Sequence, residues 1–551
     1  MTAVADTRVS APERTGSRDL AGTGTLLRLA LRRDRIMIPV WALAIGMTGS
    51  STLSRMKSTY ETATDRANVA KDMNSNGALR SMLGVAFDDS YGALTAWRVG
   101  TFLAAFAGIM SLLIVIRHTR EEEESGRQEA LSAGMVGRRA GLTSALLTVG
   151  IANAAITLLV VATLAGEGSG GALALGLSIG LTGMVFGGLA AIAAQITENA
   201  RLARGLASAA VGVAYLLRMA GDAAKDASEG SSHVLVWLSP IGWAENTRPF
   251  TQERWWTLLL LAVLAAASFA VAYVLTGRRD VGASFFASRP GPATAGSSLQ
   301  GAYGLAWRLQ RGTLLGWVVG VALSAAMLGG VANGAGDVVG DSDKNREIIE
   351  RMGGAQNIDD AFLAAMIGLI GMIVTVHTAT AVLRLRAEET DQRAEPLLAN
   401  AVSRLRWAMS HLVIAYLGPV VILVAGGLGA GIVYGAGADD LGGELPRVLG
   451  AALAQVPAVW FITSVLVLLF GLLPSYTASV GWAVVGVVVT IGWLGPALDA
   501  PQAVLNLSPF GHLPKLPGES VSAAPFVWLL LGSAVLTAAG LWGLRRRDMT
   551  N

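Results

Sequence analysis

The sequence REEEESGRQEALSAGMVGRR, residues 120–139, follows one long apolar run and directly precedes another. A second segment, RAEETDQRAEPLLANAVSR at residues 386–404, has the same setting. A shift of 266 positions (386 − 120) makes nine of the nineteen aligned positions identical. Internal identity of this density indicates that the chain contains a repeat. The identical pairs are Arg120/Arg386, Glu122/Glu388, Glu123/Glu389, Arg127/Arg393, Glu129/Glu395, Leu131/Leu397, Ala133/Ala399, Val136/Val402 and Arg138/Arg404.

Two further pairs of segments recur in the same order. LALRRDR from Leu29 corresponds to LAWRLQR from Leu305, and LSPIG from Leu238 corresponds to LSPFG from Leu507. The chain therefore contains two halves that run in the same direction, joined by a segment rich in Gly, Pro and Ser. The expected organisation is a disordered cytoplasmic tail at 1–20, a first six-span half at 21–276, a cytoplasmic linker at 277–302 and a second six-span half at 303–551.

Composition places both halves in a membrane. Hydrophobic residues make up 53% of the chain and charged residues only 15%, whereas soluble domains carry about a quarter charged residues. Apolar runs long enough to cross a bilayer as helices recur without the alternation of a β-barrel strand. The predicted fold is an all-α polytopic membrane protein with about twelve transmembrane helices in two parallel six-helix halves. The predicted spans are 36–54, 95–116, 141–163, 173–195, 203–220, 256–276, 312–332, 361–383, 407–434, 448–470, 477–496 and 524–544.

Basic residues indicate the orientation of the spans. Arg32, Arg33 and Arg35 precede the first span and Arg545–Arg547 follow the last, and basic flanks prefer the cytoplasmic side. We therefore expect both termini in the cytoplasm, with the chain in a bacterial plasma membrane. The first 20 residues lack the apolar core of a signal peptide. The net charge of +3 reflects this topology, and the sequence has no aromatic-rich basic patch typical of nucleic-acid binding.

The repeated acidic segment has two interpretations. A run of carboxylates is often only a solvated loop. Recurrence at the same place in both halves instead favours a short helix that presents Glu129 and Leu131, or Glu395 and Leu397, to a cytoplasmic partner. Charge on such a surface sets register and specificity more than affinity. A two-fold symmetric partner would meet both copies in an equivalent way.

The run EPLLANAVSR, Glu395–Arg404, with the glutamates before it, resembles the integral membrane subunits of ABC-2 type exporters. The resemblance covers nearly the whole chain. It is strongest to the double-length actinobacterial permeases grouped as exporters of polyketide antibiotics, which include tetronasin-type transport proteins. The first copy, EALSAGMVGR, has Ser132 and Gly137 where the second has Leu398 and Ser403, so the two halves could couple unequally.

The resemblance implies a role for each repeated segment. The acidic segments would be coupling helices that fit grooves in two copies of a cytosolic ABC ATPase subunit. That subunit would bind ATP and Mg²⁺, and its dimerisation would drive export of a hydrophobic small molecule. The basic segments would be connecting helices, and the Leu-Ser-Pro segments would belong to outer helical elbows. The implied coupling residues are Glu122, Glu123, Arg127, Glu129, Leu131, Arg138, Glu388, Glu389, Arg393, Glu395, Leu397 and Arg404.

The sequence contains no Walker A site for ATP hydrolysis. A Walker A loop requires Gly-Lys followed by Ser or Thr, and none of the five lysines follows a glycine. The chain has no cysteine, which excludes thiolate metal sites and thiol nucleophiles. Its five histidines lack metal-binding spacing. We therefore predict no catalytic residue, metal site or cofactor in this chain, and membrane lipids as its surroundings.

Two other functions remain open on these residues. A proton-coupled multidrug antiporter is also built from two parallel six-span halves, but its proton path requires acidic residues inside the membrane. The centres of the predicted spans contain almost none. A membrane lipid-modifying enzyme would hold magnesium and diphosphate with spaced aspartates. The Asp88–Asp89 and Asp359–Asp360 pairs lack a second acidic partner at helical spacing.

The substrate path has only weak signals. Phe102, Phe106 and Met110 recur every four residues on one face of the second span, so they could line a cavity for a lipophilic substrate. Such stripes also serve ordinary helix packing. The resemblance implies that the second and fifth spans of each half flank the path, which adds Met372 and Trp482 as candidates.

Overall fold

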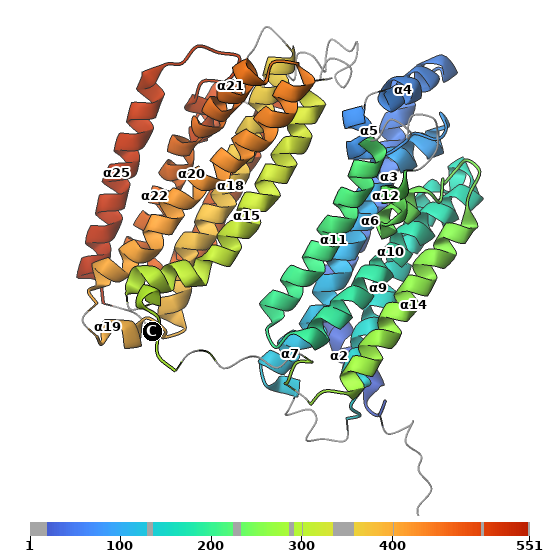
Figure 1. Ribbon diagram of the computed structural model, residues 1–551, viewed down its shortest axis with the longest axis horizontal. Helices are drawn as coiled ribbons and strands as arrows, with labels where there is room; N and C mark the ends of the chain where they lie inside the picture. The colour runs from blue at the N-terminus through green and yellow to red at the C-terminus, as the bar shows by residue number, and fades with distance from the viewer. Residues whose placement is uncertain are drawn as a thin grey trace, which may run out of the picture. The chain divides into compact units, whose positions relative to one another are not determined.

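The computed structural model describes residues 19–75, 77–128, 136–223, 233–280, 282–285, 291, 293–299, 301–333, 358–400, 402–497 and 501–548. The chain divides into two compact units, Met1–Pro290 and Gly291–Asn551. Each unit is a bundle of long helices (Figure 1). The described residues contain helices, turns and irregular segments but no strand, so the predicted all-α fold is confirmed.

The first unit has a cap of short helices at each end of its bundle. In Figure 1, α2 and α7 lie at one end, and α4, α5 and α12 lie at the other. The elements of this unit are α2 (Thr23–Arg33), α3 (Met37–Thr59), α4 (Ala63–Ser75), α5 (Gly77–Leu83), α6 (Tyr91–His118), α7 (Arg120–Glu124), α9 (Ala140–Leu164), η1 (Ala165–Glu167), α10 (Ser169–Ile196), α11 (Ala200–Ala223), α12 (Val234–Trp237), α13 (Pro240–Glu245) and α14 (Trp255–Gly277).

The second unit is also a bundle of long helices. The short helix α19 and the end of α25 lie at one end of this bundle, and α21 lies at the other (Figure 1). The elements are η3 (Ser297–Leu299), α15 (Ala302–Ala332), α18 (Ile358–Thr390), α19 (Glu395–Leu398), α20 (Arg404–Gly437), α21 (Leu441–Leu453), α22 (Val456–Leu472), η4 (Pro474–Tyr476), α23 (Thr477–Ala497), α24 (Gln502–Leu505), η5 (Pro509–His512) and α25 (Ala523–Arg546).

The predicted spans correspond to the long helices of both units. Eleven helices of the described residues are long and apolar enough to cross a membrane, and the bent pair α2 and α3 brings the number to twelve. The angle between α2 and α3 is 65°, which separates the basic segment before the first span from the span itself. In the second half, the equivalent basic segment is continuous with its span in α15. The predicted connecting helix is thus a separate helix only in the first half.

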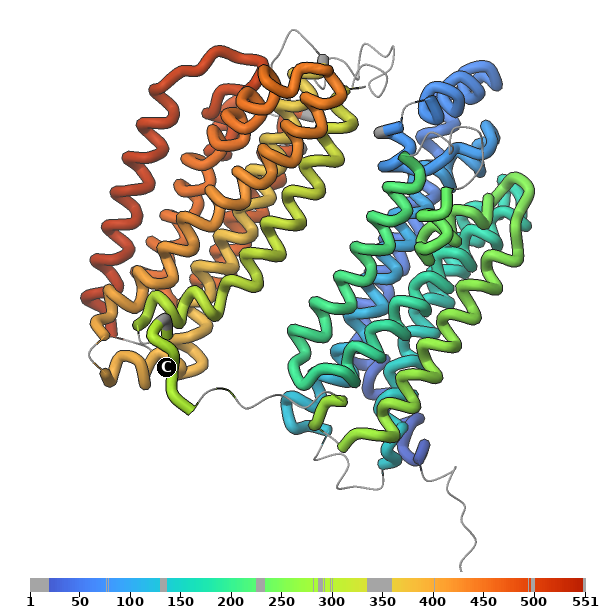
Figure 2. Tube along the Cα trace, viewed as in Figure 1, coloured from blue at the N-terminus to red at the C-terminus, as the bar shows by residue number. Residues whose placement is uncertain are grey.

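Small residues allow the long helices to pack closely. A Cβ atom at Gly471 of α22 would collide with the backbone carbonyl of Gly540 in α25, and one at Gly329 of α15 would collide with the backbone of Ala430 in α20. The two pairs α22–α25 and α15–α20 make the most extensive contacts in the second unit, and their backbones run side by side (Figure 2). Close backbone approach at small residues is how helices associate in lipid, where burial of apolar surface gives little driving force.

Candidate coupling segments and substrate path

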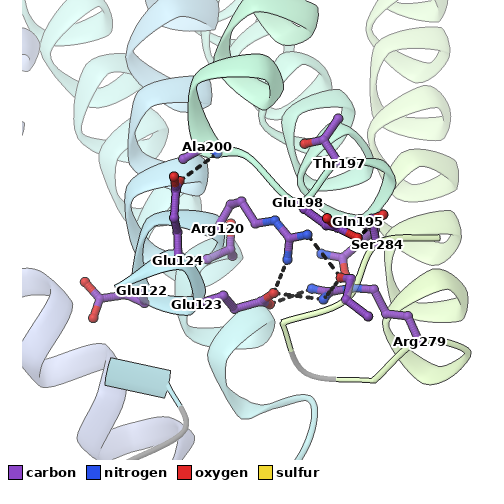
Figure 3. Close-up of polar contacts among 12 residues, drawn as sticks. Arg120, Glu122, Glu123, Glu124, Gln195, Thr197, Glu198, Ala200, Arg279 and Ser284 are labelled. Carbon is purple, nitrogen blue, oxygen red and sulfur yellow. Dashed lines mark hydrogen bonds and ion pairs between the residues drawn. The ribbon is translucent and has the colours of Figure 1, made fainter. Parts of the chain in front are cut away.

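The first five residues of the acidic segment of the first half form α7, and the glutamates of α7 are paired within the chain. Arg279, which follows α14, donates from Nη1 to Glu123 Oε2 at 2.8 Å and from Nε to Gln195 Oε1 at 2.6 Å. Arg120 also donates to Glu123 and is itself only 1% exposed. The side chains of Glu123, Arg120 and Arg279 converge between α7 and the segment after α14 (Figure 3). Glu123 therefore joins the end of the second predicted span to the end of the sixth.

The three other glutamates of α7 bind α2, α11 and the segment that follows α7. Glu122 accepts two hydrogen bonds from Arg127, at 2.8 and 3.0 Å, and one from Arg33 of α2. Glu121 lies 3.4 Å from Arg204 of α11. Glu124 accepts at 2.9 Å from the backbone N–H of Ala200, the first residue of α11, where a carboxylate complements the helix dipole (Figure 3). These contacts explain the four consecutive carboxylates, because each one stabilises the junction with a different partner.

The second half contains the same arrangement. Arg547, which follows α25, donates from Nη1 and Nη2 to the two carboxylate oxygens of Glu389 at 2.6 and 2.9 Å. Arg386 lies 3.3 Å from the same carboxylate, as Arg120 does for Glu123 in the first half. Glu389 is almost fully buried. A bidentate, buried pair of this kind fixes geometry more strongly than a surface ion pair.

A third arginine completes each copy. Arg138 donates to the backbone carbonyl of Arg279, and its repeat counterpart Arg404 donates to the carbonyl of Arg547 at 2.7 Å. We call each set a clasp: Glu123, Arg279 and Arg138 in the first half, and Glu389, Arg547 and Arg404 in the second. The clasp joins the end of the second span, the start of the third and the end of the sixth.

The identical positions of the repeat also include a hydrogen bond inside the acidic segment. Glu388 accepts from Arg393 at 3.0 Å, as Glu122 accepts from Arg127. This hydrogen bond with the Glu388 carboxylate raises the pKa of the Arg393 guanidinium. Each copy of the repeat therefore contains a glutamate and an arginine that neutralise each other's charge. The predicted coupling residues Glu122, Glu123, Glu388 and Glu389 have intramolecular partners, and their contact with an ATPase stays a prediction.

The arginine partner of each clasp escaped the sequence comparison. The tripeptide Arg-Arg-Asp occurs at 278–280 and again at 546–548, a shift of 268 (546 − 278). This shift is close to the 266 of the acidic segment. Basic residues after a span are explained by membrane orientation alone, so their position does not predict a pairing. The recurrence of Arg-Arg-Asp after both sixth spans was the available signal.

The exposed part of the second coupling segment is α19. Glu395 is exposed at its first position, while Leu397 and Leu398 are partly buried against the core of this unit. A cavity of about 510 Å³ adjoins α19 and is lined by Glu389, Ala394, Glu395, Leu398, Ala399, Val402, Ser403 and Arg404. The clasp residues Glu389 and Arg404 thus form one side of a surface hollow beside α19. Glu129 and Leu131, the first-half counterparts of Glu395 and Leu397, lie outside the described residues.

The predicted path residues of the first half lie in different surroundings. Met110 is fully buried in the core of the first unit. Phe102 is 5.9 Å from the ring of Tyr215 on α11, and Phe106 is 46% exposed. The stripe inferred from spacing therefore divides into a core residue and two residues nearer the surface. Contact with substrate stays a prediction for all three, and only Phe106 presents a large exposed surface.

The path residues of the second half also separate. Trp482 on α23 is 44% exposed. Met372 on α18 lines a cavity of about 470 Å³ bounded by α18, the start of α22, α23 and residues 502–515. Cavities of 300–1,000 Å³ hold drug-sized ligands. Met372 is therefore the path candidate that the structure places at a space large enough for a small molecule.

A buried charged group at the end of α11 was missed from the sequence. Arg218 Nη1 lies 3.4 Å from Asp222 Oδ2 and 3.6 Å from Glu245 Oε2, and Arg218 Nη2 donates to the Ser81 carbonyl at 2.9 Å. Arg218 and Asp222 are almost completely buried. The fifth span was predicted to end at residue 220, and Asp222 lies two positions beyond that end. The i, i+4 spacing of Arg218 and Asp222 was the signal for a paired charge.

Long apolar helices in two similar units define a multi-pass membrane protein of the plasma membrane. Comparison with known proteins defines the class more closely. The family model for the C-terminal domain of the multidrug efflux system permease Rv1217c matches residues 24–275 and 299–545. The multidrug efflux system permease protein Rv1217c of Mycobacterium tuberculosis (strain ATCC 25618 / H37Rv) is 42% identical over 533 residues, which cover 96% of this chain and 95% of the relative. The chain belongs to this family of multidrug efflux permeases.

Proposed function

We propose that this chain is the membrane subunit of an ATP-driven exporter of the ABC-2 class, which moves hydrophobic antibiotics or related lipophilic compounds out of the cell. Two copies of a separate cytosolic ATPase would supply the energy. Two facts support a separate ATPase: the family is one of efflux permeases, and no lysine of this chain follows a glycine as a Walker A loop requires.

The observation that carries this proposal is the duplicated clasp. An ATPase dimer has two equivalent docking sites and needs two equivalent attachment points on its membrane partner. In the second half, α19 follows α18 directly, and Glu389 and Arg404 hold this region to Arg547 at the end of α25. A displacement of α19 would therefore be transmitted to α18, α20 and α25 together. A flexible acidic loop could not transmit a displacement in this way.

The proposed docking residues lie on α19, where Glu395 is exposed, and at the corresponding positions of the first half. Glu395 and Leu397 would contact the ATPase in the second half, and Glu129 and Leu131 would do so in the first. Glu388 and Glu389, which are paired with arginines of this chain, would position α19 and would not enter the partner's groove. This arrangement requires both acidic segments, and both termini, to face the cytoplasm.

The test is charge reversal at the docking positions. Glu395→Arg and Glu129→Arg, singly and together, should reduce co-purification with an ATPase encoded beside this chain, and should reduce drug export in cells. Asp72→Arg is the matched control, because Asp72 is exposed on α4 at the opposite end of the first unit (Figure 1). All variants should reach the membrane in equal amounts. Unchanged complex formation by the double variant would refute the docking role.

A proton-coupled antiporter remains a second candidate because of the buried Asp222, Arg218 and Glu245. Buried acids are the usual elements of a proton path. That candidate predicts efflux that continues without the ATPase and stops when an uncoupler collapses the proton gradient. It also predicts that Asp222→Asn abolishes efflux in a variant that is inserted normally. The ATP-driven exporter instead predicts efflux that stops without the ATPase and continues in the presence of an uncoupler.

A further inference from the structure

The second unit contains a ligand-sized cavity at the end of its bundle away from α19. Ala364 and Ala365, near the start of α18, line this cavity, whereas the last turn of α18 leads into α19. Its volume is about 470 Å³. Its wall combines apolar side chains, among them Met372, Trp493 and Phe510, with nearly as much polar surface. A cavity with this lining suits the lipophilic body of a small molecule.

Two polar side chains of this wall are left without partners. Ser508 is fully buried, and its Oγ makes no hydrogen bond within the described part of the chain. Gln455 is 5% exposed, and no hydrogen bond of its side-chain amide occurs among those residues either. A buried polar group without a partner costs about 1–3 kcal/mol. Such groups are therefore expected to bind something that the protein itself does not provide.

The first half shows what the same serine does when it is satisfied. Ser239, the counterpart of Ser508 in the repeated Leu-Ser-Pro motif, accepts from the backbone N–H groups of Ile241 and Gly242 at 3.2 and 3.3 Å. It also donates to the Ala214 carbonyl on α11 at 2.6 Å. Ser239 thus caps α13 and has no capacity left for a ligand. Ser508 has no capping hydrogen bond at the start of η5.

Gly492 of α23 allows Met372 and Ser508 to pack directly against its backbone. A Cβ atom at this position would lie 3.2 Å from Ser508 Oγ and would press on the sulfur of Met372. Any larger residue would therefore displace Met372 or Ser508 from its present position. Both of these residues belong to the lining of the cavity.

Lys515 adds a positive charge to the same wall. Burial lowers the pKa of its ammonium group, and the nearby Glu519 acts in the opposite direction. The backbone N–H of Lys515 donates to Glu519 at 2.9 Å. Beyond this loop, Arg447 reaches the Pro517 carbonyl and is itself paired with Asp360 and Glu444. Among the described residues that line the cavity, Lys515 is the only charged one.

We propose that this cavity binds an acidic amphipathic compound. The apolar body would lie against Met372, Trp493 and Phe510, and the carboxylate would accept hydrogen bonds from Ser508, Gln455 and Lys515. The inference rests on the proposed export function for its role as a substrate site, and it adds both a substrate class and an asymmetry. The second half binds the compound at a position where the first half uses its serine for structure.

The test is equilibrium binding of 11-(dansylamino)undecanoic acid and its methyl ester to the full chain in lipid nanodiscs, with empty nanodiscs as the blank. The acid should bind saturably and more tightly than the ester. Lys515→Met should weaken the acid by about tenfold, a factor worth 1.4 kcal/mol, and leave the ester unchanged. Met372→Trp, which fills the cavity, should remove binding of both. Val487→Trp, at an exposed position of α23, is the control for added bulk.

A serine pair separates binding from folding. Ser508→Ala removes a hydroxyl without a partner, so it should weaken probe binding and leave Tm unchanged or higher. Ser239→Ala removes a satisfied cap, so it should lower Tm and leave probe binding unchanged. Absence of saturable binding would mean that the cavity holds only water, and equal binding by Met372→Trp would place the site elsewhere. Either result overturns the inference.

Co-purification of each variant with the ATPase separates this inference from the proposed function. The substrate site alone would be overturned if the wild type did not bind the probe while Met372→Trp still formed the complex and still exported drug with the ATPase. Probe binding by a chain that exports without any ATPase would overturn the proposed energy source alone.

Discussion

Loss of one residue of the second clasp should destabilise the second unit by an amount that the structure predicts. The side chains of Glu389 and Arg547 are 2% and 13% exposed, so Arg547→Ala leaves a buried carboxylate short of its main partner. Removal of one member of a buried pair costs about 3–5 kcal/mol. Arg386 remains 3.3 Å from Glu389, so we expect a loss nearer to ~2–3 kcal/mol. For a unit of this size, that corresponds to a decrease in Tm of roughly 5–10 °C.

The assay is thermal unfolding of purified wild type, Arg547→Ala, the single variants Glu389→Arg and Arg547→Glu, and the exchange variant that combines these two. The exchange restores opposite charges, so it should recover part of the lost stability, and a double-mutant cycle gives the coupling energy. Arg545→Ala is the matched control, because Arg545 is exposed two positions earlier. If Arg547→Ala is no less stable than Arg545→Ala, the clasp does not hold this end of the bundle together.

Three further predictions follow from the same contacts. The chain has no native cysteine, so Glu123→Cys with Arg279→Cys should be joined by a short bis-methanethiosulfonate reagent, which can span an Arg–Glu pair where a direct disulfide cannot. The crosslink should be visible as a mobility shift that a reductant reverses, and its absence would count against the first clasp. Glu124→Gln removes the charge at the start of α11 and should lower stability by about 0.3–1 kcal/mol, measured by thermal unfolding. Affinity for the dansylated acid should be retained while Lys515 is protonated and should decrease as the pH rises through the lowered pKa of Lys515. Affinity for the methyl ester should stay constant over the same pH range. Parallel pH profiles for the acid and the ester would contradict the role of Lys515.

The spans could be predicted from the sequence because a bilayer requires helices of a certain length and low polarity, and the order of apolar residues shows both. All twelve predicted spans have a helical counterpart when the bent pair α2 and α3 is counted as one. The apolar pattern predicts the first span but not the bend between α2 and α3. Asp34 lies at this bend and pairs with Arg117 and His118 of α6. A buried aspartate at the junction is consistent with the bend, but the pattern of apolar residues does not contain that contact.

The site was predictable only where identical residues recur. Repetition identified Glu123 and Glu389, but their partners Arg279 and Arg547 follow spans, where basic residues already have an explanation in topology. The cavity beside Met372 was not predictable in this way, because it depends on what four separate elements leave unfilled. Neither Gly492 nor Ser508 indicates a cavity until both are placed against α18. The contacts of Glu129 and Glu395 with a partner stay predictions.

The different use of Ser239 and Ser508 has a consequence for how such a permease can change. In a homodimer of a shorter chain, every substitution would appear twice, so a mutation that enlarged a ligand cavity would also remove the helix cap on the other side. With both copies encoded in one gene, the two positions can vary independently. Selection by a new toxic compound can therefore alter residues near Ser508 while Ser239 continues to stabilise its own half.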